Sequence, residues 1–278
     1  MSLSQQTLVV LILRGMRLDQ TPAFASLLRA DEALAVQCFD NGQVQWSELP
    51  SHWRMVSDGA NPGVGPRYLE AAHIAKECGF PFLLLLDQDF QAPEGWWAAY
   101  WEVVKNHPSA SAWAPTLDGP GRQLSPFCLD GARPGDAPTT DSLLSLKRHV
   151  ALNSGLLVRT DPVLTADASL RICPLDFSDF ALCHAMGLRD GWLAPVSLRL
   201  EHSSSTHLES SQASRLARFR WFAYGAKGWS RLRPEHRLSI AHWVLGRGLQ
   251  LAFQYRSMGF LACVWRNFLR GDPPGSNT

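Results

Sequence analysis

Residues 83–90 read Leu-Leu-Leu-Leu-Asp-Gln-Asp-Phe, an uninterrupted apolar run that stops at two carboxylates. A short run without polar residues is typical of a strand that is buried on both faces of a sheet. Because side chains alternate along a strand, Asp87 and Asp89 are expected to point the same way. Two neighbouring carboxylates repel each other unless a cation lies between them, and Mg²⁺ or Mn²⁺ prefers such oxygen ligands. The stretch therefore predicts either a metal site at a strand end or an ordinary polar turn, where Asp is also common.

Short apolar runs alternate with stretches of helical spacing along the rest of the chain. This order predicts an α/β domain built on a mostly parallel sheet. Helices are expected at residues 21–28 and 68–78, the second after the Gly/Pro-rich stretch 61–66, which is either a simple turn or a close backbone approach to a ligand. Residues 115–145 hold several Gly and Pro with little periodicity and are expected to form a long loop. The predicted strands are residues 7–13, 33–39, 81–86, 111–114, 151–158 and 192–200.

The charge is divided unevenly between a long acidic part and a short basic part. Residues 210–278 hold 11 Lys and Arg against 2 acidic residues, a net +9, whereas residues 1–209 hold 15 against 23, a net −8. An acidic body argues against nucleic-acid binding, and the basic segment suits phosphates or an anionic membrane surface. The hydrophobic fraction of 46% is ample for a buried core.

The cysteines and the N-terminus bear on the cellular compartment. No two of the six cysteines form a C-x-x-C pair, so reduced, buried thiols are expected. The apolar stretch 8–13 is too short for a secretory signal and is followed by Arg14. It is interpreted as the first strand, and a cytoplasmic protein is expected.

Asp40 follows the second predicted strand and is a candidate ligand-binding residue. In open α/β sheets, ligands bind outside the carboxyl ends of the strands, so Asp40 is placed to accept a hydrogen bond from a base or ribose. The tripeptide Asp40-Asn41-Gly42 is also an ideal turn sequence, which gives it a purely structural interpretation.

A second acidic cluster, Asp176-Phe-Ser-Asp179, is followed by a predicted strand and then by His202. An acid after one segment and a histidine after the next are placed to converge on the metal inferred above. The alternatives are that Asp179 caps a helix over residues 180–186 and that His202 is structural, as lone histidines more often are.

The order of these motifs resembles the family-2 glycosyltransferases of GT-A fold, and within them the bacterial rhamnosyltransferase-like branch. The resemblance covers residues 7–230, and its most specific part is Leu-Asp-Gln-Asp at 86–89. The other motifs that carry it are Asp40-Asn41, Asn61-x-Gly63-x-Gly65, Asn153-Ser154-Gly155, Asp176-x-x-Asp179 and His202.

This resemblance implies a GT-A catalytic domain at residues 1–209 and a helical extension at residues 210–278. Asp179 stands where the family has its catalytic base, although the sequence does not separate it from Asp176. The sugar and acceptor pocket would be lined by Asn153, Ser154 and Gly155. The donor-binding residues would be Asp40, Asn61, Gly63, Asp87, Gln88 and Asp89, with Mg²⁺ or Mn²⁺ held by Asp87, Asp89 and His202.

The implied reaction is an inverting sugar transfer from a nucleoside diphosphate to a hydroxyl of a cell-surface glycan or a lipid-linked acceptor. The metal would offset the charge on the leaving diphosphate, and a carboxylate would take the proton of the attacking hydroxyl. dTDP-rhamnose is the favoured donor by resemblance, with a UDP-sugar as the other candidate.

The chain departs from the family pattern in two places. Leu13-Arg14-Gly15 replaces an aromatic-Asn pair after the first strand, and Cys183-His184 stands where an Arg often follows the base. A non-catalytic descendant that binds a sugar nucleotide or a membrane is therefore the alternative. An aspartate-nucleophile phosphatase is disfavoured, because Phe90-Gln91 follows the acidic pair where that class has Thr or Val.

Residues 214–270 carry basic and aromatic side chains at helical spacing, and no stretch is long and apolar enough to span a bilayer. Such helices suit a peripheral position on the inner face of the cytoplasmic membrane, where a lipid-linked acceptor is found. Equally, their aromatic residues can pack on the catalytic core.

Overall fold

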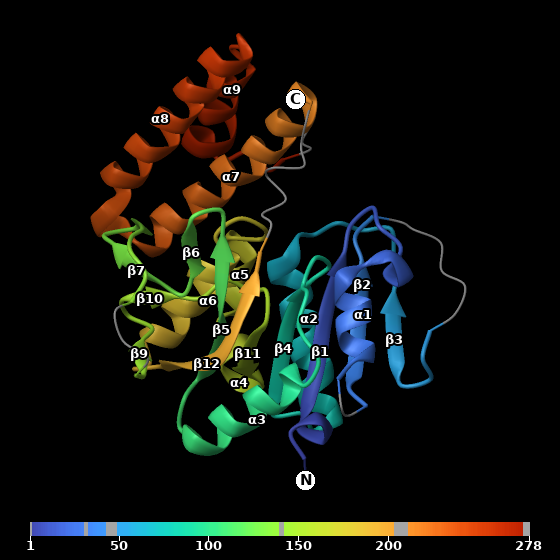
Figure 1. Cartoon of the computed structure of the whole chain (residues 1–278). Helices are drawn as coiled ribbons and strands as arrows, with labels where there is room; N and C mark the ends of the chain where they lie inside the picture. Colours follow the sequence, from blue (N-terminus) through green and yellow to red (C-terminus); the bar gives the residue numbers. More distant parts are fainter. Residues whose placement is uncertain (1, 31–32, 43–48, 139–141, 203–210, 275–278) are drawn as a thin grey trace.

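The computed structural model of the chain describes residues 2–30, 33–42, 49–138, 142–202 and 211–274 (Figure 1). Within these residues a nine-stranded sheet forms the centre of the molecule. Its strands are β1 (Thr7–Leu13), β2 (Ala35–Asp40), β3 (Trp53–Val56), β4 (Phe82–Asp87), β5 (Ala112–Gly119), β6 (Arg122–Ser125), β9 (Leu144–Ser145), β11 (Leu156–Arg159) and β12 (Trp192–Glu201). The strand order is β3-β2-β1-β4-β11-β5-β12-β9, with β6 paired to β5.

The direction of the strands brings several carboxyl ends to one edge of this sheet. Strands β3, β2, β1 and β4 are parallel, and β12 is parallel to β5. Strand β11 is antiparallel to both β4 and β5, so these two strands run the same way. The carboxyl ends of β1, β2, β4, β5 and β12 therefore share the upper edge in Figure 1, where ligands of open α/β sheets bind.

Helices cover both faces of the sheet, as the alternation of side chains along buried strands requires. Leu8, Val10 and Ile12 of β1 pack on one face with α2, and the intervening residues of β1 pack on the other face with α1 and α3. The domain helices are α1 (Pro22–Leu28), α2 (Val64–Cys78), α3 (Trp96–Asn106), α4 (Thr160–Thr165), α5 (Asp167–Ile172) and α6 (Ser178–Gly187), with short 3₁₀ helices η1 (Ser4–Gln6) and η2 (Leu18–Gln20).

The C-terminal residues form helices that stand on the carboxyl side of β5 and β12 (Figure 1). Trp229 of the first of them is fully buried and donates through Nε1 to the Ala132 carbonyl at 2.9 Å. Its ring lies edge-on to Phe180, 5.5 Å between centroids. The predicted packing of C-terminal aromatic residues on the core is therefore confirmed for this helix. These elements are α7 (Gln212–Leu232), η4 (Pro234–His236), α8 (Arg237–Tyr255), α9 (Gly259–Cys263) and a π-helix, η5 (Val264–Arg270).

The expectation of a long loop at residues 115–145 is wrong. Strand β5 continues to Gly119 and turns back into β6, and a small second sheet follows. Its strands are too short to show an alternating pattern: β7 (Phe127–Asp130), β8 (Arg133–Pro134) and β10 (His149–Val150).

The other predicted elements agree with the structure to different degrees. The first strand is confirmed without change, and the strands predicted at 33–39, 81–86 and 192–200 each end one residue later. The strand predicted at 151–158 begins only at Leu156, because Gly155 has φ +82° and ends a turn. Buried cysteines are confirmed at four positions, whereas Cys78 is exposed and Cys128 is half-buried, and all six are free.

Candidate functional site

The acidic pair of the opening stretch lies at the end of β4. The strand ends at Asp87, and Asp89 lies in the following turn, where the Phe90 amide donates to the Asp87 carbonyl. The strand-alternation argument for a shared direction therefore does not apply to Asp89. Gln88 anchors the turn, because its Oε1 accepts from the Arg14 amide at 2.8 Å and its carbonyl accepts from the Ala23 amide.

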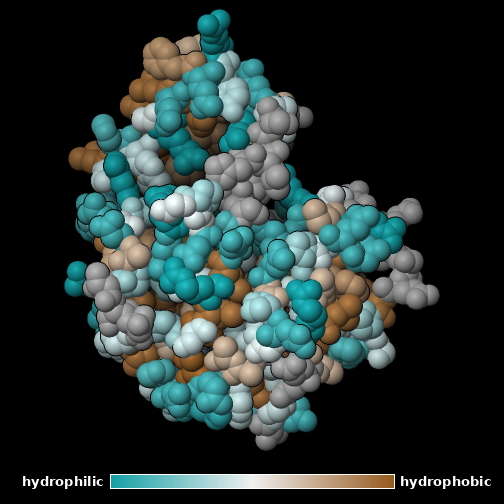
Figure 2. All heavy atoms as spheres, viewed as in Figure 1, coloured by the Kyte–Doolittle hydropathy of each residue, from teal (hydrophilic) through white to brown (hydrophobic). Residues whose placement is uncertain are grey.

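Asp87 is recessed, and charges of its own turn and of two other segments act on it. The pKa of its carboxyl is raised to about 6, chiefly by burial and also by Asp89, although His202 and Arg218 lower it. Its side chain nevertheless keeps partial exposure to solvent. Figure 2 shows a hollow between the C-terminal helices and the side of the domain that carries β1 to β3. Asp87, Asp89 and His202 thus lie close enough to interact at the carboxyl edge of the sheet, and we call the surroundings of Asp87 the recess.

The donor set bears on the predicted metal. Two carboxylates, one of which raises the pKa of the other, are a pair that a hard divalent cation stabilises. Across the described ranges, however, no three His, Cys, Asp or Glu side chains form a ready metal-binding group. Asp87 and Asp89 therefore fit a cation that takes its remaining ligands elsewhere, such as from a substrate phosphate, and the His202 ligand stays a prediction.

Asp179 is the second acidic group of the recess. The pKa of its carboxyl is raised to about 7, chiefly by burial and also by the neighbouring Asp176 and Asp87, although hydrogen bonds from the Phe180 and Asp179 amides lower it. The N-cap of α6 is Phe177, at φ +68°, and Asp179 lies in the first turn. The prediction that Asp179 caps this helix is therefore wrong, because the turn at Phe177 already begins it.

Asp176 differs from Asp179 in having a strong cationic partner. Arg218 of α7 binds both of its carboxylate oxygens, at 2.8 and 2.9 Å. Burial raises the pKa of Asp176, while Arg218 and Arg247 lower it. A carboxylate in a bidentate ion pair with an arginine is a poor proton acceptor. Asp176 and Asp179, which the sequence did not separate, are therefore distinguished by their partners.

Three buried polar atoms in the recess have no hydrogen-bond partner of standard geometry among the described residues: Asn153 Oδ1, Ser154 Oγ and the Tyr68 hydroxyl. Asn153 donates through Nδ2 to Ser178 Oγ and lies close enough to Tyr68 to lower its pKa. Burial raises the pKa of Tyr68 well above its usual value, as do Asp87 and Asp179. Unsatisfied buried groups call for an explanation, and a bound ligand is one.

Tyr68 is a site residue that sequence reasoning missed. It comes from α2 and is fully buried between the two acidic groups. In the sequence, Tyr68 lies in an apolar helical stretch and looks like any aromatic residue of a core. Its hydroxyl group, on the buried face of α2, is the one feature that could have indicated a site residue.

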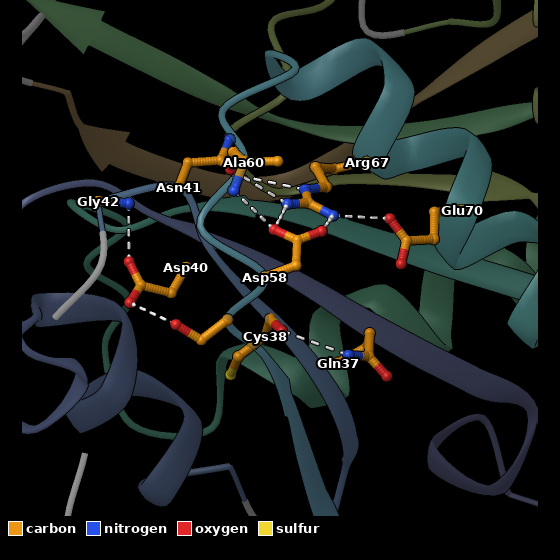
Figure 3. Close-up of polar contacts among 10 residues, drawn as sticks. Gln37, Cys38, Asp40, Asn41, Gly42, Asp58, Ala60, Arg67 and Glu70 are labelled. Carbon is orange, nitrogen blue, oxygen red and sulfur yellow. Dashed lines mark hydrogen bonds and ion pairs between the residues drawn. The ribbon is translucent and has the colours of Figure 1, made fainter. Parts of the chain in front are cut away.

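Figure 3 shows the network beside the β2 end. Asp40 is fully buried, its Oδ1 accepts from the Gly42 amide at 2.8 Å, and its Oδ2 accepts from Ser57 Oγ at 3.3 Å. The turn interpretation of Asp40-Asn41-Gly42 is therefore confirmed, and a contact with a base stays a prediction.

Arg67 organises the loops beside this turn and was also missed. It binds the Asn41 side chain, both carboxylate oxygens of Asp58 and the Glu70 carboxylate (Figure 3). Its hydrogen bonds hold the pKa of Asp58 at about 2.

The glycines after Asn61 pack against protein backbone. Gly63 has φ +94°, and a Cβ there would lie 2.2 Å from the Pro174 carbonyl oxygen. The Gly65 amide donates to the same oxygen at 2.9 Å, while Asn61 is exposed. The start of α2 thus holds the segment that leads to Asp176. Donor contacts from Asn61 and Gly63 stay predictions.

A separate cavity of about 330 Å³ lies at the opposite edge of the sheet, lined by residues that include Phe80, Arg159 and Thr160. It lies away from Asp87, because Phe80 and Arg159 lie at the end of β4 opposite to that residue. It therefore does not contribute to the recess.

Comparisons with known proteins relate this chain to others by structure alone. No protein-family model matches the sequence, and no curated protein sequence is significantly similar to it. The crystal structure of GalNAc-T7 with UDP, GalNAc and Mn²⁺ superposes with a TM-score of 0.57 at 13% identity, over 82% of this chain and 47% of that chain. The structure of S. aureus TarS 1-349 in complex with UDP gives a TM-score of 0.48 at 11% identity, over 96% and 83%.

At these identities the comparison concerns the fold. The mostly parallel sheet flanked by helices, with C-terminal helices, is the GT-A fold, and the predicted fold class is confirmed. The chain spans about half the length of the GalNAc-T7 chain.

Proposed function

We propose that the protein is a metal-dependent glycosyltransferase that moves a sugar from a nucleoside diphosphate to a hydroxyl group. The observation that carries this proposal is the recess at the carboxyl edge of a GT-A sheet, where the charge of Asp87 acts on Asp179 and that of Asp89 acts on Asp87. A sugar-nucleotide site on this fold needs a cation for the diphosphate and a separate base for the acceptor, and we assign these roles to an ion held by Asp87 and Asp89 and to Asp179.

The donor side of the reaction is assigned to the β4 end. Asp87 and Asp89 would hold Mg²⁺ or Mn²⁺, with His202 as a further ligand, and the bound ion would offset the charge that develops on the leaving diphosphate. Asp40, Asn61, Gly63 and Gln88 are proposed to surround the nucleotide. The comparison structure of GalNAc-T7 contains UDP and Mn²⁺, which supports this assignment by fold only.

The acceptor side is assigned to Asp179. A pKa of about 7 leaves a large fraction of its carboxyl deprotonated at neutral pH and still basic enough to take a proton from a hydroxyl. Asp176 is engaged by Arg218, which favours Asp179 as the base. Asn153, Ser154 and Gly155 would line the sugar and acceptor pocket, and the unpartnered atoms of Asn153 and Ser154 would accept or donate hydrogen bonds there. Direct attack on the anomeric carbon would invert its configuration.

The finer assignments extend the resemblance stated above. The donor is proposed to be dTDP-rhamnose or a UDP-sugar, and the acceptor a growing cell-surface glycan or a lipid-linked sugar. The catalytic domain is proposed at residues 1–209, with a helical extension at 210–278, in a cytoplasmic protein.

Peripheral membrane contact is proposed for the C-terminal helices. Figure 2 shows brown surface over the C-terminal helices. Large apolar side chains are exposed along α8 and beyond it: Leu238, Leu245, Leu249, Phe253, Met258, Trp265 and Leu269. None of the described helices is both long enough and apolar enough to cross a bilayer. Sedimentation with anionic vesicles at low salt tests this contact, and a Phe253→Ser variant is expected to sediment less.

The experiment that tests the proposed function is calorimetric titration with a panel of nucleoside diphosphates and sugar nucleotides, with and without Mn²⁺. Binding is expected to require the metal and to be lost in an Asp87→Asn, Asp89→Asn variant. An Asp161→Asn, Asp167→Asn variant is the matched control, because these exposed carboxylates pair with Lys76 and Arg171 at the surface. A folded protein that binds no nucleotide would contradict the donor assignment. Binding without turnover, unchanged by Asp179→Asn, would favour the non-catalytic alternative.

A further inference from the structure

Phe177, at the start of α6, has a strained backbone next to the proposed base. Its φ is +68° and its ψ is 11°, a left-handed conformation that glycine adopts freely and that a bulky side chain disfavours. Asp179 follows two residues later, in the first turn of the helix. A strained residue of this kind persists only when its surroundings hold it in place. The contacts of Phe177 therefore decide the direction in which α6 begins.

Aromatic residues of two C-terminal helices hold the Phe177 side chain. Phe177 is 5% exposed, and its ring lies 5.5 Å from that of Phe222 on α7 and 5.6 Å from that of Trp243 on α8. Phe222 and Trp243 also contact each other edge-on, at 5.4 Å between centroids. We call Phe222 and Trp243 the aromatic pair. Tilted and edge-to-face ring contacts stabilise a structure beyond the burial of their area, so the aromatic pair opposes the backbone strain.

Backbone contacts join Phe177 to the first turn of α6 and to α7. The Ala181 amide donates to the Phe177 carbonyl at 2.9 Å, which closes the turn around Asp179. On α7, a Cβ on Gly225 would lie 3.2 Å from Phe177 Cδ2, so the helix backbone approaches the ring closely. Because Asp179 lies within this hydrogen-bonded turn, a rotation of the backbone at Phe177 would move its carboxylate.

We propose that the aromatic pair positions the catalytic base. Phe222 and Trp243 hold the ring of Phe177, and Phe177 directs the turn that carries Asp179. Both members of the pair act through Phe177 and are therefore positioning residues. The C-terminal helices thereby take part in catalysis through packing, a role separate from their proposed membrane contact. The inference rests on the proposed function for the role of Asp179, whereas the ring contacts do not depend on it.

The first experiment measures amide hydrogen exchange in the full chain by mass spectrometry. In Trp243→Leu, exchange over residues 177–181 is expected to be faster by about 3- to 10-fold, because an aromatic ring contact contributes about that factor to local stability. Exchange in β1 is expected to stay at the wild-type rate, since its pairing with β2 and β4 is untouched. Trp243→Phe keeps an aromatic ring at this position and is expected to restore most of the protection over residues 177–181.

Trp101→Leu is the matched control for this experiment. Trp101 is half-buried like Trp243, but it packs on the opposite face of the sheet, so exchange over residues 177–181 is expected to equal that of the wild type. Circular dichroism establishes that each variant is folded, and Phe222→Leu serves if Trp243→Leu is not. Equal exchange in the wild type and Trp243→Leu, or a rise that β1 shares equally, would overturn the proposal.

The second experiment separates a role in catalysis from a purely structural one. Trp243→Leu is expected to lower kcat for sugar transfer by about 10- to 100-fold, since a small displacement of a catalytic group costs up to about that factor. KM for the donor should stay unchanged, because Asp87 lies on β4. Trp243→Phe is expected to recover most of kcat, and Trp101→Leu to keep the wild-type value.

The two experiments distinguish failure of this inference from failure of the proposed function. A raised KM with unchanged kcat in Trp243→Leu, or faster exchange with undiminished kcat, would overturn the positioning role. Undiminished kcat in Asp179→Asn would instead contradict the assignment of the base. The exchange data would then still decide whether the aromatic pair holds the start of α6.

Discussion

The two acidic segments of the recess are held in place in different ways. Asp87 ends a strand that is paired with β1 along its whole length, and with β11 over residues 82–85. Asp176 lies on an irregular segment between α5 and α6, and Asp179 follows it in the first turn of α6, so neither is positioned by a strand. The first position follows from a sheet, and the second requires contacts between residues far apart in the sequence.

Glycines on two other helices supply those contacts. At the start of α2, a Cβ on Gly63 would lie 2.2 Å from the Pro174 carbonyl oxygen. On α7, a Cβ on Gly225 would lie 2.3 Å from the Asp176 carbonyl oxygen, and one on Gly228 would lie 2.1 Å from that of Ile172. The segment before α6 is thus clamped between α2 and α7 by backbone approaches that only glycine permits. A strand therefore positions one half of the recess, and close helix packing positions the other half.

The largest expected effect concerns Asp179, which follows the clamped segment in the first turn of α6. Asp179→Asn removes the proposed base while keeping the shape of the side chain, so the rate of sugar transfer is expected to fall by about 10²- to 10⁴-fold. Metal-dependent nucleotide binding should be retained, because Asp87 and Asp89 are unchanged. Steady-state kinetics and calorimetry measure the two quantities. If the Asp179→Asn protein transferred sugar at an undiminished rate, another residue would be the base. The clamped segment would then have no role in catalysis through Asp179.

The next effect concerns the clamp itself. Gly225→Val would force side-chain atoms into the Asp176 backbone and is expected to lower the free energy of unfolding by about 3 kcal/mol, since overpacked contacts cost about that much. Gly246→Ala is the matched control, because a Cβ at this position on α8 would meet nothing within 4 Å. That change should stabilise the helix by about 0.5–1 kcal/mol. Chemical denaturation measures both, and equal effects would show that α7 does not clamp the segment.

The sequence predicted the strand-based half of the molecule well. Apolar runs at 7–13 and 81–86 correspond to β1 and β4, because a strand buried on both faces needs an uninterrupted apolar run. The place of Asp87 at a carboxyl end follows directly. The small strands near residues 127–150 could not be predicted, since two to four residues carry no readable period.

For the half of the recess that helix packing positions, the sequence predicted which residues take part but not how they are arranged. Asp176 and Asp179 were recognised as an acidic cluster, but their difference depends on Arg218, which lies 42 residues from Asp176 in the chain. Gly63 was interpreted as a turn or a ligand contact, and its packing on Pro174 depends on where α5 ends. Long-range partners of this kind are set by tertiary structure, and no local pattern in one sequence contains them.

A smaller effect should appear in the pH dependence of stability. The pKa of Asp179 is about 7 in the folded protein, above its unfolded value of 3.8, so the folded state binds the extra proton more tightly. Its contribution to stability is full below pH 3.8 and is lost as the pH rises to about 7. Without divalent metal, the melting temperature of Asp179→Asn is therefore expected to fall less than that of the wild type between about pH 4 and about pH 7.5. Parallel curves would mean that Asp179 is ionised throughout this range.

The smallest expected effect concerns the turn after β4. The Gln88 side chain accepts from the Arg14 amide at 2.8 Å, so Gln88→Ala removes one hydrogen bond and should cost about 1 kcal/mol of unfolding free energy. Gln91→Ala, at an exposed position in the same loop, is the control and should change it by less than about 0.5 kcal/mol. Because the pairing of β4 with β1 and β11 is untouched, Asp87 should keep its position. Gln88→Ala could instead destabilise the protein as much as Gly225→Val does. The end of β4 would then depend on single contacts as strongly as the clamped segment does, and these contacts, rather than the sheet, would position Asp87.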